Sequence, residues 1–139
     1  MSERGSQLET KISQWFKTLN DKGIHAHKNH PKRTITGLFQ EGEPYDFEIF
    51  MGNKLYVFDA KECQNDKWYL SNAKPEQIKH LLNCANHGAD AFFLVYFWKT
   101  KSLIKFSIHI ILTALQTNKK HLTVEDGERF NLYVISQAN

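Results

Sequence analysis

Asp46, Asp59 and Lys61 are the residues of this sequence whose types and spacing could do chemistry. The two aspartates are thirteen positions apart, and each belongs to an apolar run that is typical of a β-strand. Side chains alternate between the two faces of a strand, so Asp59 and Lys61 should point the same way. Each charge is costly to bury unpaired, so this face is either a solvated edge or a functional site.

A hairpin would bring both carboxylates together. The runs 45–50 and 54–61 are joined by Met-Gly-Asn-Lys, which favours a tight turn. Two carboxylates at close range repel unless a cation lies between them, and Mg²⁺ accepts carboxylates, a backbone carbonyl and waters. Lys61 could then orient or deprotonate a water, or neutralise charge on a phosphate. The predicted chemistry is metal-assisted phosphodiester hydrolysis; the alternative is an exposed ion pair worth under about 1 kcal/mol.

The elements that must position these residues indicate an α/β (α+β) domain with a mixed sheet between helices. Ser6 and Glu9 have the spacing of a capping box at the start of the first helix. The run 91–98 is apolar without alternation, which is typical of a strand covered on both faces. The expected elements are a helix over 6–22, an alternating stretch from 24, the hairpin, a loop over 65–74, a helix over 75–86, the buried strand, a strand passing into a helix over 102–118, and a last strand over 130–135.

Composition sets wider bounds. The 139 residues suit one domain, and the net charge of +3 permits a polyanionic partner without requiring one. Two cysteines give no disulfide framework, and no apolar run is long enough to span a membrane. The N-terminal residues lack the apolar core of a signal peptide. We therefore expect a single domain over 1–139 that is cytoplasmic and has no membrane partner.

The pattern of Pro-Tyr-Asp, twelve further residues and Asp-Ala-Lys resembles the PD-(D/E)XK nuclease signature, with Tyr45 as an extra residue. Three segments, "RGSQLETKISQWFKTLNDKGIHAHKNHP", "YDFEIFMGNKLYVFDAKEC" and "KPEQIKHLLNCANHGADAFFLVYF", are similar in order to RecU-type Holliday junction resolvases. The resemblance covers roughly residues 4–98. It implies a restriction-endonuclease-like mixed β-sheet flanked by helices on both faces.

The resemblance also implies roles for individual residues. Asp46, Asp59 and the backbone carbonyl of Ala60 would bind the metal, and Lys61 would be the catalytic lysine. Gln77 matches a glutamine that the family places near the scissile phosphate. One further catalytic residue, Glu9, matches a glutamate that completes the site in many of these enzymes, although a capping box explains it equally well.

Two departures from the family qualify these roles. The family usually has glutamate where this chain has the shorter Asp59, which can alter the metal geometry. RecU proteins also have a longer segment before the first catalytic aspartate, a stalk that enters the junction centre, and residues 33–46 leave little room for one. The short segment bears on junction selectivity more than on cleavage.

A basic cluster between the first helix and the hairpin suits contacts with DNA phosphates, which position DNA without reading its sequence. The alternative is an ordinary solvated loop. The candidate DNA-binding residues are Arg4, Lys28, Lys32, Arg33 and Lys67. Trp68, beside Lys67, is better explained by packing than by contact with a base.

A zinc site and a nucleophilic cysteine are the other chemical interpretations. His25, His27 and His30 are close in sequence, and strand alternation would put His25 and His27 on one face as a pair of ligands. No third and fourth ligand stand at a recognised zinc spacing from this pair. Cys63 has no arrangement around it that would activate a nucleophile, so we expect it to be buried.

These observations favour a Mg²⁺-dependent endonuclease, with Mn²⁺ able to substitute, that resembles a Holliday junction resolvase acting on branched DNA in recombination. A resolvase cuts two symmetric strands, so a homodimer is expected. Two alternatives remain open: a nuclease of the same fold with another DNA substrate in phage or defence metabolism, and an inactive DNA-binding domain. A bacterial or phage-encoded protein fits each of them.

Overall fold

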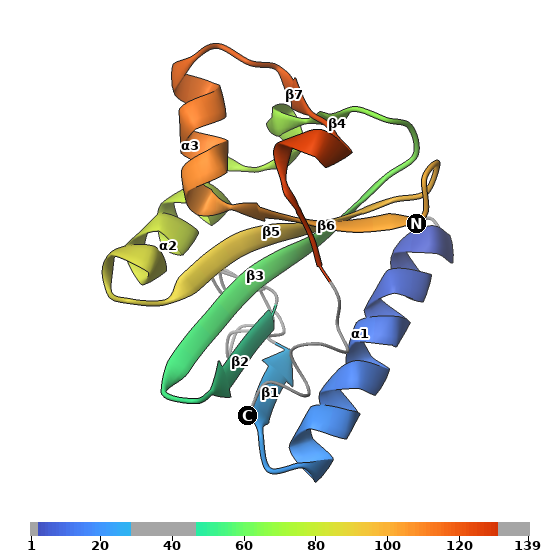
Figure 1. The fold of residues 1–139 in the computed structure, drawn as a ribbon, viewed down its shortest axis with the longest axis vertical. Helices are drawn as coiled ribbons and strands as arrows, with labels where there is room; N and C mark the ends of the chain where they lie inside the picture. The colour runs from blue at the N-terminus through green and yellow to red at the C-terminus, as the bar shows by residue number, and fades with distance from the viewer. Residues whose placement is uncertain (1–2, 29–46, 131–139) are drawn as a thin grey trace, which may run out of the picture.

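The computed structural model describes residues 3–28 and 47–130, with side chains from residue 8 onward (Figure 1). The described residues form three α-helices, eight strands and two short 3-10 turns. In order they are α1 (Glu3–Asp21), β1 (His25–Lys28), β2 (Phe47–Met51), β3 (Lys54–Cys63), β4 (Trp68–Tyr69), the 3-10 turn η1 (Leu70–Asn72), α2 (Pro75–Asn86), β5 (Asp90–Phe97), β6 (Ser102–Ser107), α3 (Ile108–Gln116), β7 (His121–Leu122), η2 (Val124–Asp126) and β8 (Glu128–Arg129).

The main sheet has six strands in the order β1-β2-β3-β5-β6-β8. The central pair, β3 and β5, is parallel, and every other neighbouring pair in this sheet is antiparallel. Parallel strands need a crossover connection, and α2 supplies it between β3 and β5. Two short strands, β4 and β7, form a separate antiparallel pair. The predicted mixed sheet is confirmed.

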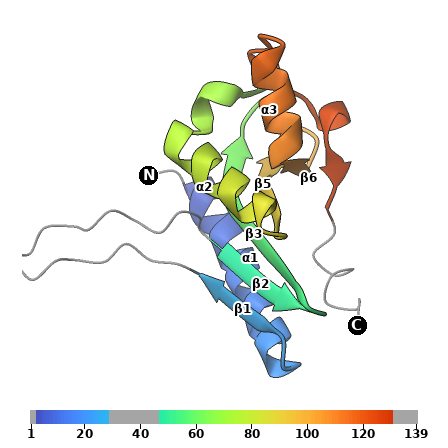
Figure 2. The same cartoon turned by 90° about the vertical axis from the view of Figure 1, so that its left-hand side faces the viewer.

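Helices cover both faces of this sheet, as predicted. Figure 1 shows α2 and α3 on the upper left and α1 on the lower right, and Figure 2 shows α1 passing behind β1, β2 and β3. Alternation along β3 sends Phe58 to the core under α1 and Val57 to the core under α2 and α3. The buried strand β5 serves both cores in the same way, which explains why its sequence does not alternate.

The predicted hairpin is formed by β2 and β3. Gly52 and Asn53 link the strands with φ values of 59° and 63°, the left-handed conformation that a type I′ turn requires at both central residues. The turn fixes the register, in which Met51 lies opposite Lys54 and Phe47 lies opposite Phe58.

Three expectations need correction or lie outside the described residues. The first helix begins at Glu3, where an acidic residue suits the helix dipole, so Ser6 lies inside the helix and is not its N-cap. The expected loop over 65–74 contains β4 and η1, because Trp68 is buried and stacks on Phe106 with ring centroids 5.8 Å apart. The expected last strand is described only at Phe130, whose N–H donates to the Leu103 carbonyl at 2.8 Å.

Among the described helices, none is long and apolar enough to cross a membrane.

Candidate active site

Asp59 is a charged residue in the middle of a central strand, and only 1 % of it is exposed. It lies two residues after Val57 and four before Cys63, both of which pack in the core under α2 and α3. Because β3 is continuous from Lys54 to Cys63, alternation places Asp59 and the half-buried Lys61 on this same face. The backbone of β3 therefore agrees with the prediction that Asp59 and Lys61 share one face of the strand.

The pairing of β3 with β2 can be followed only as far as Phe58, because β2 is described from Phe47 onward. The described ladder between them ends at Phe47 opposite Phe58, whereas the pairing with β5 continues from Asp59 opposite Phe93 to Cys63 opposite Phe97. Asp46 precedes Phe47 in the chain and lies outside the described residues, so its role as a metal ligand stays a prediction.

Gln77 lies in the first turn of α2, where its side-chain oxygen accepts the Lys74 backbone N–H at 3.2 Å. This bond leaves the side-chain amide –NH₂, a donor, for other partners. Since α2 connects the carboxyl end of β3 to the start of the parallel strand β5, it must run antiparallel to both. Gln77 is thus at the end of α2 nearest the carboxyl end of β3, over the face that carries Lys61.

The Glu9 carboxylate forms an ion pair with Lys28. Its Oε1 lies 2.5 Å from Lys28 Nζ, and this ammonium is also 5.9 Å from the centre of the Phe47 ring. Both residues lie on the α1 side of the sheet, where Phe47 packs, whereas Asp59 points to the α2 side. Glu9, a predicted catalytic residue, is thus the ion-pair partner of Lys28, a predicted DNA-binding residue.

Cys63 is buried, as predicted, and organises the loop that follows β3. Its thiol donates to the carbonyls of Asn65 and Lys67, at 3.3 and 3.2 Å. Burial raises the pKa of the Cys63 thiol, as does nearby Asp66, and the hydrogen bond at Asn65 offsets them only in part. The thiol therefore stays protonated at neutral pH, and its bonds leave Lys67 on an exposed loop directly beyond β3.

The remaining predicted residues are partly outside the described structure and partly on β1. Lys32, Arg33 and His30 lie outside the described residues, as does the side chain of Arg4. His25 Nε2 lies 3.0 Å from Glu48 Oε2, and its ring stacks on His27 at 6.1 Å. Within residues 3–28 and 47–130, no group of three or more His, Cys, Asp or Glu side chains could hold a metal ion.

One polar contact beside the site could not be read from the sequence. Trp98 Nε1 donates to Glu62 Oε1 at 2.5 Å, between residues 36 positions apart. Alternation puts Glu62 on the opposite face of β3 from Lys61, so the contact with Trp98 holds the strand on the face away from Lys61. The available sequence signal was a carboxylate directly after Asp-Ala-Lys, but nothing local identified Trp98 as its partner.

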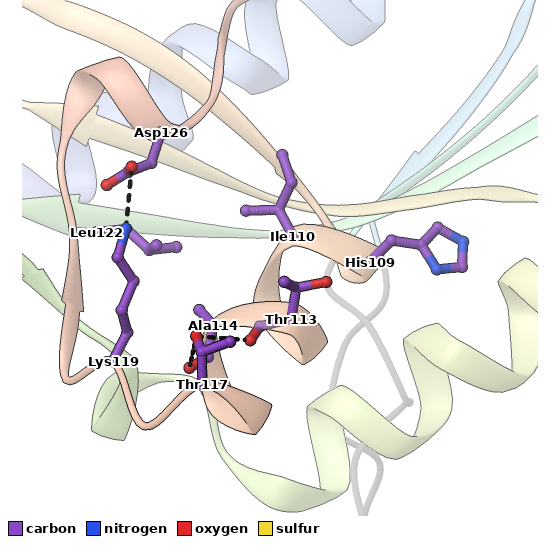
Figure 3. Close-up of a pocket in the computed structure, with 8 residues that line it drawn as sticks. All are labelled: His109, Ile110, Thr113, Ala114, Thr117, Lys119, Leu122 and Asp126. Atoms are coloured by element: carbon purple, nitrogen blue, oxygen red, sulfur yellow. Dashed lines mark hydrogen bonds and ion pairs between the residues drawn. The ribbon is translucent and has the colours of Figure 1, made fainter.

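The cavity in Figure 3 is separate from this site. It has a volume of about 360 Å³ and lies between α3 and the segment from β7 to η2. An ion pair crosses one side of it, with Lys119 Nζ 3.2 Å from Asp126 Oδ1. None of its lining residues belongs to β3 or α2, so the carboxylate–lysine chemistry lies elsewhere.

A mixed sheet with helices on both faces and an Asp-x-Lys pair on a central strand defines a restriction-endonuclease-like nuclease fold. The chain belongs to the RecU family, described as Recombination protein U, which it matches over residues 3–137. The predicted family resemblance is confirmed, and membership supports the predicted class, a Holliday junction resolvase-like nuclease.

One solved structure agrees on the fold. The chain is similar to Hjc from Archaeoglobus fulgidus, a Holliday junction resolvase from an archaeal hyperthermophile, with a TM-score of 0.59 and 14 % identity over 94 % of this chain and 98 % of that one. A weaker likeness to SSO0001 has a TM-score of 0.44 and 11 % identity over 96 % of this chain and 55 % of that one. No curated protein matches the sequence.

Proposed function

We propose that the chain is a divalent-metal-dependent endonuclease that hydrolyses phosphodiester bonds in four-way or otherwise branched DNA. The observation that carries the proposal is the buried carboxylate of Asp59 on one face of β3 with Lys61. A carboxylate in such a position is costly unless its surroundings supply compensating charge, and it is therefore a candidate functional group.

The described donors fit a hard cation in type, because Asp59 offers a carboxylate and Ala60 a backbone carbonyl. If the pairing of Phe47 with Phe58 were carried one step further, Asp46 would stand opposite Asp59 as the third oxygen donor. We therefore assign metal binding to Asp46, Asp59 and Ala60, with Mg²⁺ as the ion and Mn²⁺ as its substitute. A bound divalent ion would lower the pKa of a water and neutralise charge on the phosphate.

The chain's own groups do the remaining work. Lys61 adds a positive charge on the face of Asp59, where it stabilises the charge that develops on the phosphate. The –NH₂ of Gln77 would donate to a phosphate oxygen or to the attacking water. Glu9 is the remaining residue to which we assign a catalytic role. Its carboxylate pairs with Lys28 on the α1 side of the sheet, so this role requires the site to extend beyond the face of Asp59.

DNA would approach over the basic residues. Lys67 is exposed on the loop beyond β3, and Lys28 lies at the end of β1. Together with Arg4, Lys32 and Arg33 they would contact phosphates and so position the duplex without reading sequence. Two symmetric cuts require two active sites, so we propose a homodimer that works in the cytoplasm.

Cleavage of a labelled synthetic four-way junction with Mg²⁺, beside a linear duplex of the same sequence, tests the proposal. We compare the native chain with Asp59→Asn, which removes the charge at nearly constant volume, and with Asp66→Asn, a matched change on the exposed loop. Paired nicks on the junction, lost in Asp59→Asn and kept in Asp66→Asn, are the expected result.

Two other results would revise the proposal. Equal cutting of junction and duplex would keep the nuclease and remove the selectivity for branched DNA, in agreement with the short segment before Asp46. Tight junction binding by the native chain without cleavage under Mg²⁺ or Mn²⁺ would identify a DNA-binding domain that has lost turnover.

A further inference from the structure

An apolar groove lies at the end of the molecule where α2 begins and α3 ends. Its volume is about 720 Å³. It contains two of the most exposed large apolar side chains of the described residues, Tyr69 at 47 % and Leu115 at 41 %. Aliphatic side chains form most of the remaining wall, namely Leu70, Ala73, Pro75, Ile78 and Leu82. Contiguous exposed apolar surface of this kind marks an interaction site.

The charges of the rim have one sign. Lys79, Lys119 and Lys120 line the groove, and no Asp or Glu does. Lys119 is paired with Asp126 (Figure 3), whereas Lys79 and Lys120 have no ion pair within the part of the chain that the structure describes. A partner that covers the apolar floor would therefore gain most if it placed carboxylates against these two lysines.

We propose that this groove docks an acidic amphipathic helix of another protein. Helices bind such grooves through apolar residues at i, i+3 or i+4, and i+7, and acidic residues on the flanks of the helix would meet the lysines. The surface lies outside the assigned active site, since it includes none of Asp59, Lys61 or Gln77. It thus gives the nuclease a means of recruitment that does not occupy its catalytic residues.

Three other occupants fit less well. A second copy bound symmetrically would bring two lysine rims together, which is repulsive. The C-terminal residues 131–139 contain no Asp or Glu and could not neutralise the rim. Single-stranded DNA would match the lysines, but bases stack on aromatic platforms, and Tyr69 is the one aromatic residue in this lining.

Binding of a synthetic helix to the full chain tests the inference by fluorescence anisotropy. The probe is a labelled peptide of about 16 residues with leucines on one face and glutamates beside them. One control peptide has the same composition with its leucines spread around the helix, and another has lysines in place of the glutamates. We expect saturable binding of the first peptide alone.

Variants of the chain locate the binding. Leu115→Ser removes an exposed apolar contact and should weaken binding about tenfold, while Lys79→Glu should weaken it about fivefold. Lys99→Glu makes the same charge change in the exposed turn after β5 and should leave binding unchanged. Because all three positions are exposed, folding should be retained.

Failure of this inference is separable from failure of the nuclease, because junction cleavage is measured on the same samples. Cleavage by the native chain without peptide binding overturns the docking site and leaves the nuclease intact. Equal binding of the lysine peptide also overturns it. Displacement of the peptide by junction DNA, together with weaker junction binding by Lys79→Glu, would assign the groove to DNA instead.

Discussion

The contact between Glu9 and Lys28 allows a structural role to be separated from a catalytic one. The two charged atoms are 2.5 Å apart, but the side chains are 49 % and 34 % exposed, so solvent screens the attraction. Pairs of this kind contribute about 0.2–1 kcal/mol to the free energy of unfolding. A double-mutant cycle of Glu9→Gln and Lys28→Met, followed by urea unfolding, should give a coupling energy in this range.

The effects on cleavage should diverge. If Glu9 completes the active site, Glu9→Gln should lower the single-turnover rate at saturating junction at least about tenfold, which is typical when a supporting carboxylate of a metal site is lost. Lys28→Met should instead weaken junction binding, with its rate at saturation little changed, since a phosphate contact positions the DNA. Glu76→Gln, an exposed glutamate on α2, serves as the matched control.

One pattern of results would refute the catalytic role of Glu9. If Glu9→Gln shows the expected coupling to Lys28 in unfolding but cleaves at the native rate, Glu9 is only the ion-pair partner of Lys28. A coupling energy well above the range for exposed pairs would refute the screening estimate instead.

Two further predictions concern the segment after β7. Gly127→Ala would place a Cβ 2.6 Å from the Lys105 carbonyl oxygen and 2.6 Å from Ile104 Cγ2, so the pairing of β8 with β6 should be disrupted at a cost of about 1–3 kcal/mol in urea unfolding. Burial alone would raise the pKa of Asp126, but hydrogen bonds from Thr123 and Lys119 outweigh burial and leave that pKa lowered. A lowered folded pKa gives stability that is present above the unfolded value of about 4 and is lost as the pH falls through the folded value. Asp126→Asn should therefore be less stable than the native chain by about 1 kcal/mol at pH 7, with the gap closing as the pH falls below about 4; an equal gap at pH 7 and in acid would contradict this assignment.

The elements that the sequence predicted well are those fixed by local chemistry. The turn at Gly52 and Asn53 sets the hairpin register without help from distant residues. Pro75 suits the first turn of α2, and the strand β5 was identified from its uninterrupted apolar run. The face shared by Asp59 and Lys61 follows from strand alternation alone, which explains why the centre of the candidate site was accessible from sequence.

The elements that were missed depend on contacts between distant segments. Ser6 has the spacing of a cap, but the helix continues through it to Glu3. The strand β4 exists because Trp68 is buried against Phe93 and Phe106, and its partner β7 comes more than fifty residues later in the chain. No local pattern encodes such pairings, and the same holds for the contact of Glu62 with Trp98.

Two opposing requirements meet at Asp59. A central strand is most favourably buried with apolar side chains, whereas the proposed site needs charged side chains on that strand. From Tyr56 to Phe58, β3 pairs with both β2 and β5, and its apolar side chains fill both cores. From Asp59 to Cys63 the strand continues its pairing with β5 and carries the charged residues Asp59, Lys61 and Glu62. Glu62 accepts a bond from Trp98 on the α1 side, which anchors the backbone while Lys61 faces the other way. A strand held by β5 and by this bond can present Asp59 and Lys61 in a fixed geometry, as a phosphodiester-cleaving site requires.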